Sequence, residues 1–196
     1  MNGAPTPHSQ MQVPGLYVYI TNALTRNHMF DAKLIPETAS AGLQEGYTVR
    51  PLQLEDYEKG ILKVLTVLTE VGEISKPEFE ELYEYWATAS TNSKLAPRIF
   101  YPIVIESDER QIVAAGTLIV EQKLIHQRAL AGHIEDISVD TNQQGKKLGK
   151  RIIDALTGIG KSVGCYKIIL DCDEKNVGFY EKCGYSRAGV EMHIRT

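Results

Sequence analysis

Residues 133–156 read HIEDISVDTNQQGKKLGKRIIDAL, and this stretch decides the fold. It joins a strand-like run to a basic loop with two glycines and then to an amphipathic helix. The N–H groups at a helix N-terminus point outward, and the helix dipole favours an anion there. A second strand-like run, YKIILDC at 166–172, and a short helical motif, NVGFYEKCGY at 176–185, follow. The stretch therefore predicts a pyrophosphate-binding cleft that a downstream tyrosine can reach.

The composition limits the class of protein. The chain has 196 residues, 43% hydrophobic and 23% charged, which is typical of one soluble domain with an extension. The net charge of −4 argues against nucleic-acid binding. Three cysteines without a C-x-x-C pair indicate a reducing compartment, so we expect a cytoplasmic protein without a disulfide or zinc framework. We see no signal peptide and no run approaching the roughly 18 apolar residues of a membrane span.

Two regions differ in composition. Residues 1–44 are rich in Pro, Gly, Thr, Asn and Ala, and we expect an N-terminal extension that is partly disordered or docked on the core. Residues 45–196 form the predicted domain, which begins with a strand in EGYTVRPL and a helix over 54–68. A capping box at Ser75 starts a second helix. Its buried stripe is predicted to be Phe79, Leu82, Tyr83 and Trp86.

The second half of the chain alternates strands and helices. The runs at 99–106 and 111–125 are separated by Ser-Asp-Glu-Arg, which predicts a hairpin. Pro102 indicates a bulge or an edge position. After the decisive stretch, the run YSRAGVEMHIR at 185–195 predicts a closing strand. The expected order is strand, two helices, three strands, helix, strand, helix and strand.

This order and the loop QGKKLG at 144–149 resemble the GCN5-related N-acetyltransferase (GNAT) superfamily, whose loop usually reads Q/R-x-x-G-x-G/A. The resemblance implies an α/β (α+β) fold with a mixed, mostly antiparallel central sheet and helices on both sides. It also implies acetyl-CoA as co-substrate. Lys147 replaces the inner glycine; a lysine can keep helical dihedrals and add charge. The alternative interpretation is a solvated basic helix start.

A competing motif lies at 155–162, where ALTGIGKS fits a relaxed P-loop pattern. A P-loop follows a strand and precedes a helix. Here the motif ends a helical pattern and precedes a strand, so the context is reversed. We expect its glycines to end the helix and form the turn.

Acetylation of an amine requires a proton acceptor, a polarised thioester carbonyl and a stabilised leaving thiolate. Glu135 and Asp136 are the candidate acceptors; as strand neighbours they are expected to face opposite sides, and both could instead be solvated or ion-paired. Tyr180 is the candidate acid because a phenol stays protonated at neutral pH, although it could also be a core aromatic. The superfamily resemblance extends to NVGFYEKCGY at 176–185, in which Asn176 and Tyr180 take the places of the superfamily's cofactor-contacting asparagine and its tyrosine. It implies cofactor contacts at Ile137, Ser138, Val139, Gly145, Lys146, Lys147, Leu148, Gly149, Lys150, Asn176 and Tyr180, with Glu181 and Lys182 nearby.

A narrower resemblance covers about residues 45–196. KVLTVLTEVG, GHIEDISV, GCYKIILDCDEKNVGFYEKCGY and GVEMHIR are similar to the eukaryotic, most of all fungal, glucosamine 6-phosphate N-acetyltransferase family. This resemblance implies acetyl transfer to the 2-amino group of the sugar in UDP-N-acetylglucosamine synthesis. It implies a homodimer with shared active sites, and sugar-phosphate contacts at Thr66, Glu121, Lys123, Glu135, Asp136, Lys167, Asp171 and Arg195.

Other functions remain open at this stage. An acetyltransferase of protein N-termini or lysines would need an open groove for a peptide, whereas Lys123, Lys167 and Arg195 favour a phosphate. An acetyltransferase of another small amine is a further alternative. A non-catalytic acyl-CoA-binding module would tolerate the loss of Tyr180. We expect no metal, because the histidines at 126, 133 and 193 lack ligand spacing.

Overall fold

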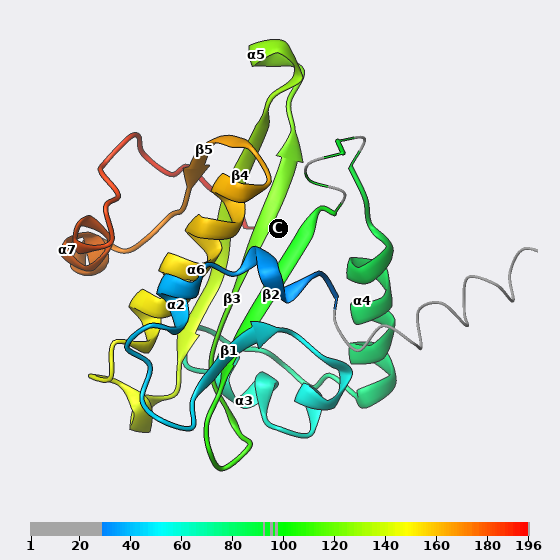
Figure 1. The fold of residues 1–196 in the computed structure, drawn as a ribbon, viewed down its shortest axis with the longest axis vertical. Helices are drawn as coiled ribbons and strands as arrows, with labels where there is room; N and C mark the ends of the chain where they lie inside the picture. The colour runs from blue at the N-terminus through cyan, green and yellow to red at the C-terminus, as the bar shows by residue number, and fades with distance from the viewer. Residues whose placement is uncertain (1–28, 92, 95, 97, 196) are drawn as a thin grey trace, which may run out of the picture.

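The computed structural model describes residues 29–195 except 92, 95 and 97, and its centre is a five-stranded sheet (Figure 1). The strands β1 to β4 pair antiparallel in chain order, and β5 pairs parallel with β4. The predicted mixed, mostly antiparallel sheet is therefore confirmed. Its strands are β1 (Thr48–Pro51), β2 (Phe100–Glu106), β3 (Ile112–Gln122), β4 (Leu130–Val139) and β5 (Cys165–Ile169).

Helices cover both faces of the sheet. A Cβ atom on Gly116 of β3 would lie 2.6 Å from Ile152 of α6, whereas the next residue, Thr117, lines a cavity under α3 and α4. Consecutive strand residues point to opposite faces, so α6 and the α3–α4 pair lie on opposite sides. The α-helices are α2 (Glu37–Ser40), α3 (Ile61–Leu65), α4 (Lys76–Thr88), α5 (Ile125–Arg128), α6 (Leu148–Ser162) and α7 (Val177–Lys182), and the 3-10 turns are η1 (Ala32–Leu34), η2 (Leu54–Tyr57), η3 (Thr141–Gln143) and η4 (Glu174–Asn176).

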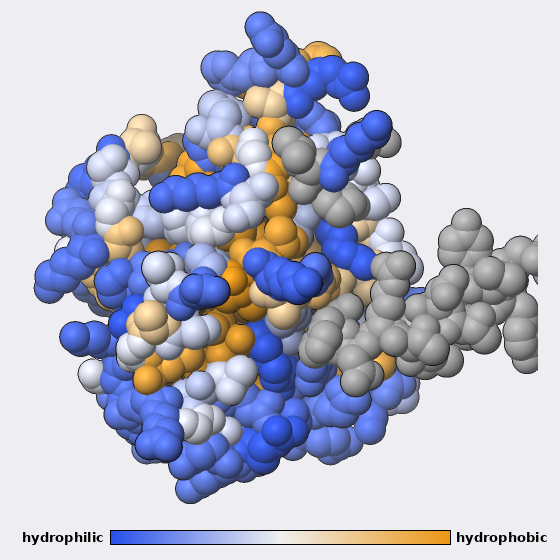
Figure 2. Space-filling model, viewed as in Figure 1, coloured by the Kyte–Doolittle hydropathy of each residue, from blue (hydrophilic) through white to orange (hydrophobic). Residues whose placement is uncertain are grey.

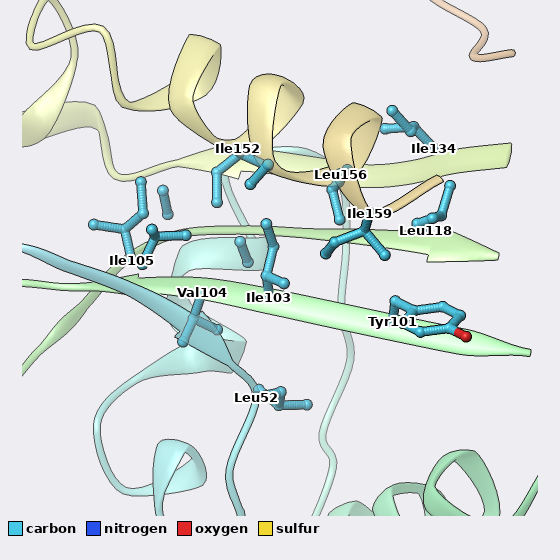
Figure 3. Close-up of a cluster of buried hydrophobic side chains, with 14 of the residues drawn as sticks. Leu52, Tyr101, Ile103, Val104, Ile105, Leu118, Ile134, Ile152, Leu156 and Ile159 are labelled. Carbon is cyan, nitrogen blue, oxygen red and sulfur yellow. The ribbon is translucent and has the colours of Figure 1, made fainter. Parts of the chain in front are cut away.

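The core lies between α6 and the sheet. Ile152, Leu156 and Ile159 of α6 are fully buried and point toward the sheet residues Ile103 and Leu118 (Figure 3). Burial of side chains of this size stabilises the fold by roughly 1.5–3 kcal/mol each. On the face drawn in Figure 2, hydrophilic residues surround apolar residues that gather over the middle of the sheet. No helix in the described residues is long and apolar enough to cross a membrane.

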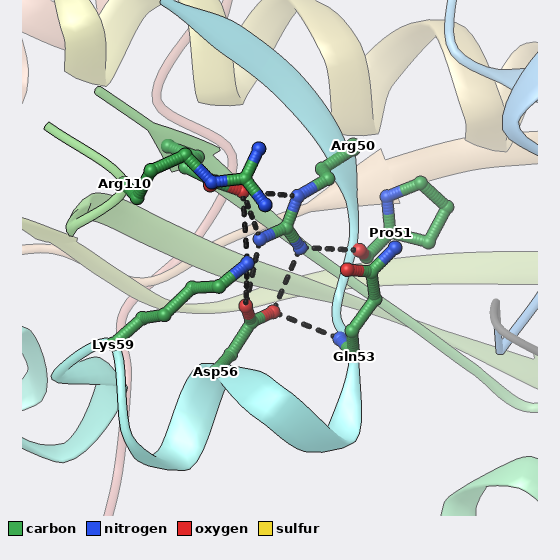
Figure 4. Close-up of polar contacts among 7 residues, drawn as sticks. Arg50, Pro51, Gln53, Asp56, Lys59 and Arg110 are labelled. Atoms are coloured by element: carbon green, nitrogen blue, oxygen red, sulfur yellow. Dashed lines mark hydrogen bonds and ion pairs between the residues drawn. The ribbon is translucent and has the colours of Figure 1, made fainter. Parts of the chain in front are cut away.

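A buried ionic cluster fixes β1 against the β2–β3 hairpin (Figure 4). The guanidinium of Arg50 contacts Asp56 at 2.7 Å and Glu106 at 2.5 Å. Lys59 approaches the same Glu106 carboxylate at 3.2 Å. Since Asp56 and Glu106 are buried, their pairing with cations is required to avoid isolated buried charges.

The predicted order of elements is confirmed up to α7, except that the short α5 between β3 and β4 was not expected. Four local corrections apply. The helix expected over 54–68 is divided into η2 and α3, because Gly60 at φ 90° interrupts it. In α4, whose capping box at Ser75 is confirmed, Leu82 is 41% exposed and does not belong to the buried stripe. Pro102 lies past the last residue pair between β1 and β2, so its missing N–H costs no ladder bond, and the nearest bulge in β2 lies at 105–106.

The expected closing strand is the fourth correction. Residues 185–195 form no strand, and Val190, Met192 and Ile194 are 87–88% exposed. A strand needs a neighbouring strand to satisfy its backbone groups, and none in the described chain pairs with this segment. The alternating pattern of the sequence is therefore present without the partner that would make it a strand.

Candidate active site

A cleft opens where β4 and β5 part. Only residues 130–133 of β4 pair with β5, while β4 continues to Val139. A bulge lies where the strands part. Ser138 pairs with Ala115 and Glu135 pairs with Thr117, so three residue steps in β4 lie opposite two in β3. Asp136, within the bulge, has a positive φ of 56°. Bulges bend a strand and increase its local twist. The end of β4 is thus free of β5 and exposes backbone groups to a ligand.

The cleft has a volume of about 640 Å³ and lies between the end of β4, the loop before α6, and α7. It contains most of the predicted cofactor residues. Gln144, Phe179 and Cys183 also line it and were missed in the residue prediction; Gln144 belongs to the loop motif itself and could have been found from it. The predicted residues in its lining are Ile137, Val139, Gly145, Lys147, Leu148, Gly149, Lys150, Asn176, Tyr180 and Lys182.

The loop before α6 has the geometry of an anion site. The first helical bond runs from Arg151 N–H to the Lys147 carbonyl, so the three N–H groups before Arg151 have no helical acceptor. Gly145 has φ 81° and Lys147 has φ 61°. The sequence-based expectation that Lys147 keeps helical dihedrals is therefore wrong: the chain must turn there, and lysine takes the left-handed region that glycine adopts without strain.

Close packing of α7 completes the cleft. A Cβ atom on Gly149 would lie 3.4 Å from Phe179 Cζ, so the small residue lets α7 approach α6. Burial, followed by the thiols of Cys172 and Cys183, raises the pKa of Tyr180, which keeps its phenol protonated at neutral pH. A protonated phenol in the cleft can donate a hydrogen bond to a developing thiolate.

Three predicted cofactor residues do not line the cleft. Ser138 is buried and donates from Oγ to the Val64 carbonyl. Lys146 turns to Tyr47 and Gln143, which its ammonium reaches at 3.0 and 2.5 Å. Glu181 lies on α7 outside the lining. A motif identifies a run of residues, but it does not show which side chains in the run point into the cleft. The backbone conformation of each residue decides that.

The candidate proton acceptors share one face of the sheet. Glu135 is paired with Thr117, and Asp136 lines the same cavity as Thr117. The expectation of opposite faces is therefore wrong, because the bulge at Asp136 breaks the strand alternation. Desolvation raises the pKa of both carboxyls, and the charges of Asp136 and Asp171 raise that of Glu135 further. A higher pKa makes each carboxylate a better proton acceptor.

The remaining predicted sugar-phosphate residues fall into separate groups. Glu121 contacts Lys123 at 2.5 Å and His133 at 3.1 Å. Lys167 and Asp171 are exposed on β5 and directly after it, beside the same region of β4. Thr66 ends α3 and donates to the Lys63 carbonyl. Arg195 lies in the exposed tail, so the single chain does not bring it to a defined place in the site.

A second cavity of about 110 Å³ adjoins Asp136 on the α3–α4 side. Leu65, Phe79, Trp86 and Pro102 are among its mostly apolar lining. The helical spacing of Phe79 and Trp86 predicted that both belong to the core, and no sequence motif marks the cavity. Among the described residues, no group of three or more His, Cys, Asp or Glu side chains could hold a metal ion.

The end of β4, the N-terminus of α6 and the tyrosine on α7 line one cleft. The family model described as Acetyltransferase (GNAT) family matches residues 65–185. The chain belongs to this acetyltransferase family.

Individual relatives are similar over most of their length. The Candida albicans protein named glucosamine 6-phosphate N-acetyltransferase is 51% identical over 153 residues, covering 78% of this chain and 98% of that protein. A Dictyostelium discoideum protein named glucosamine 6-phosphate N-acetyltransferase 1 is 42% identical, covering 79% and 94%. The crystal structure of glucosamine-6-phosphate N-acetyltransferase from Arabidopsis thaliana has a TM-score of 0.71 and 36% identity, covering 77% of this chain and 99% of that one.

Proposed function

We propose that this chain transfers the acetyl group of acetyl-CoA to the 2-amino group of glucosamine 6-phosphate, giving N-acetylglucosamine 6-phosphate and CoA. The proposal rests on the 51% identity with the Candida albicans protein named glucosamine 6-phosphate N-acetyltransferase, because the match covers 98% of that protein. The product feeds UDP-N-acetylglucosamine synthesis. Three cysteines without a disulfide favour a reducing, cytoplasmic setting.

The cofactor fits the cleft between β4 and α6. The free N–H groups before Arg151 would hold the pyrophosphate, and the charges of Lys147 and Lys182 would attract it. The backbone of Ile137 and Val139, which β5 leaves unpaired, would bind the pantetheine arm and polarise the thioester carbonyl. Acetyl-CoA supplies the activated acyl group, and the reaction needs no metal.

The chemistry is a direct transfer. The substrate amine forms a C–N bond with the thioester carbon, and the C–S bond breaks. Glu135 or Asp136 takes the proton that the amine loses, since both carboxylates have a raised pKa. Tyr180 donates its phenolic proton or a hydrogen bond to the departing CoA thiolate.

The active unit is a homodimer in this proposal. Val190, Met192 and Ile194 alternate with polar residues and are almost fully exposed. Such a pattern is stabilised when the segment adds as a strand to a second copy. Strand exchange would place Arg195 at a shared site, where it would bind the sugar phosphate with Lys123 and Lys167.

The test is thiol release from acetyl-CoA with three acceptors: glucosamine 6-phosphate, glucosamine and a lysine peptide. Rapid release with the phosphorylated sugar alone supports the proposal. Release with the peptide alone identifies a protein acetyltransferase instead. Binding of acetyl-CoA without release with any acceptor identifies a non-catalytic module.

A further inference from the structure

A three-residue contact ties the cofactor loop to the start of the domain. The Tyr47 hydroxyl donates to Gln143 Oε1 at 2.8 Å. The Lys146 ammonium donates to Tyr47 Oη at 3.0 Å and to Gln143 Oε1 at 2.5 Å. The same ammonium lies 5.3 Å from the centre of the Tyr47 ring. All three residues are half-buried, so the contacts are partly shielded from water.

The segment that carries Tyr47 follows α6 from its middle to its N-terminus. Pro36 packs on Gly158, where a Cβ atom would lie 2.4 Å from the Pro36 ring. Arg151 donates to the Thr38 carbonyl at 3.3 Å. Tyr47 contacts Gln143 and Lys146 at the loop. Residues 36–47 therefore pack along α6 and the loop that precedes it.

The contact acts on the one strained residue of the loop. Lys146 directly precedes Lys147, whose left-handed conformation is strained for a residue with a Cβ atom. That conformation begins α6 and aims the N–H groups of the first turn into the cleft. Holding the Lys146 side chain on the far side of the loop restrains the backbone that must take this turn.

We propose that Tyr47 is a positioning residue for the acyl-CoA loop, acting through Lys146 and Gln143. This inference rests on the proposed function, because it assigns Tyr47 a part in binding CoA without touching it.

The first test compares Tyr47→Phe with wild-type protein. Loss of the hydroxyl should raise the Kd of CoA, measured by calorimetry, and the KM for acetyl-CoA by about fivefold, the net size of one ordinary hydrogen bond. The kcat and the KM for the sugar phosphate should stay within about twofold, because the reacting atoms are untouched. Tyr57→Phe is the matched control: it removes a hydroxyl bonded to the Ile74 carbonyl, away from the loop, and should leave CoA binding unchanged.

The second test is a double-mutant cycle with Lys146→Met. If the two side chains act as one unit, the double variant should bind CoA no more weakly than Lys146→Met alone. Additive losses would mean that Lys146 binds the cofactor independently, and would overturn the inference. Unchanged CoA affinity in Tyr47→Phe would overturn it as well. Wild-type protein that fails to bind CoA would overturn the proposed function itself, which separates the two failures.

Discussion

The hydroxyl of Ser138 donates a 2.5 Å hydrogen bond to the main-chain carbonyl of Val64, joining the bulged end of β4 to α3, which covers one face of the sheet. Ser138 comes two residues after the bulge, and Val64 comes two residues before Thr66. The bond therefore links the part of β4 that borders the cleft to the segment that carries a predicted substrate residue. Both residues are buried, so water cannot replace the Ser138 hydroxyl as a donor to the Val64 carbonyl.

Replacing Ser138 with Ala should lower the free energy of unfolding by about 1 kcal/mol, because the buried Val64 carbonyl loses its side-chain donor and keeps only local backbone donors from Thr66 and Val67. Urea denaturation measures the change. Ser138→Cys fills the same space with a weaker donor and should recover part of the loss. An unchanged unfolding midpoint in Ser138→Ala would show that the bond contributes nothing to stability.

Replacing Lys147 with Gly should raise the free energy of unfolding by about 0.5–1 kcal/mol. Removing the Cβ atom relieves the left-handed strain of roughly 1–2 kcal/mol, which stabilises the protein. The greater conformational entropy of glycine in the unfolded chain offsets about 0.5–1 kcal/mol of this gain. Lys147→Ala keeps the Cβ atom and removes the charge, so it should not stabilise the protein. Equal effects of the two variants on denaturation would attribute the change to charge and not to backbone strain.

The sequence predicted the parts of this protein that depend on local patterns. The capping box at Ser75 and the helix after Gly145 follow from short-range spacing, and both are present. The cleft residues were predictable because the loop motif and the NVGFYEKCGY motif each place several of them. The bulge at Asp136 was not predictable from alternation, since no residue in HIEDISV marks it and it depends on pairing with β3.

Long-range contacts account for the other differences. Gln143 and Lys146 meet Tyr47 from 96 and 99 residues away, and nothing near the loop in sequence indicates that contact. The tail at 185–195 has the alternation of a strand, but a strand forms only with a partner. Local sequence therefore specifies what a segment can be, and tertiary or quaternary partners decide what it becomes.

The ionic cluster at β1 makes stability depend on pH. Burial by itself raises the pKa of Glu106, but Arg50 and Lys59 outweigh it and hold the pKa below its ordinary value. A carboxyl with a lowered folded pKa stabilises the protein above its unfolded pKa of about 4.3, and this stability is lost as the pH falls toward the folded value. Urea denaturation of wild-type protein between pH 6 and pH 3 should show the decline.

Glu106→Gln tests the assignment. The variant should be less stable than wild-type protein at pH 6, because the buried Arg50 loses a charged partner. The difference between the two proteins should shrink as the pH falls from about 4.3 toward the lower pKa of the folded carboxyl, because wild-type Glu106 takes up its proton first in the unfolded chain and then in the folded protein. A constant difference across the range would mean that Glu106 is not the titrating group.

Tyr180→Phe should lower kcat by about tenfold to a hundredfold, because the leaving thiolate loses its donor. The Kd of acetyl-CoA should change little, since the ring that lines the cleft remains. Tyr185→Phe is the matched control: Tyr185 is 6.5 Å away between ring centres, and its hydroxyl bonds to Thr157 outside the cleft lining. Wild-type turnover in Tyr180→Phe would remove the tyrosine as the acid.

Arg195→Ala tests whether the exposed tail reaches an active site. If a second copy accepts the tail as a strand, Arg195 binds the sugar phosphate, and its loss should raise the KM for glucosamine 6-phosphate about tenfold. The KM for acetyl-CoA should stay the same, because the cofactor cleft lies elsewhere. Arg187→Ala is the control, since Arg187 lies in the same segment but pairs with Glu174. Sedimentation should give about twice the chain mass of 21.8 kDa for all three proteins. A fully active monomer, or an Arg195→Ala variant with wild-type constants, would contradict the shared site, since then no partner would need to supply the arginine.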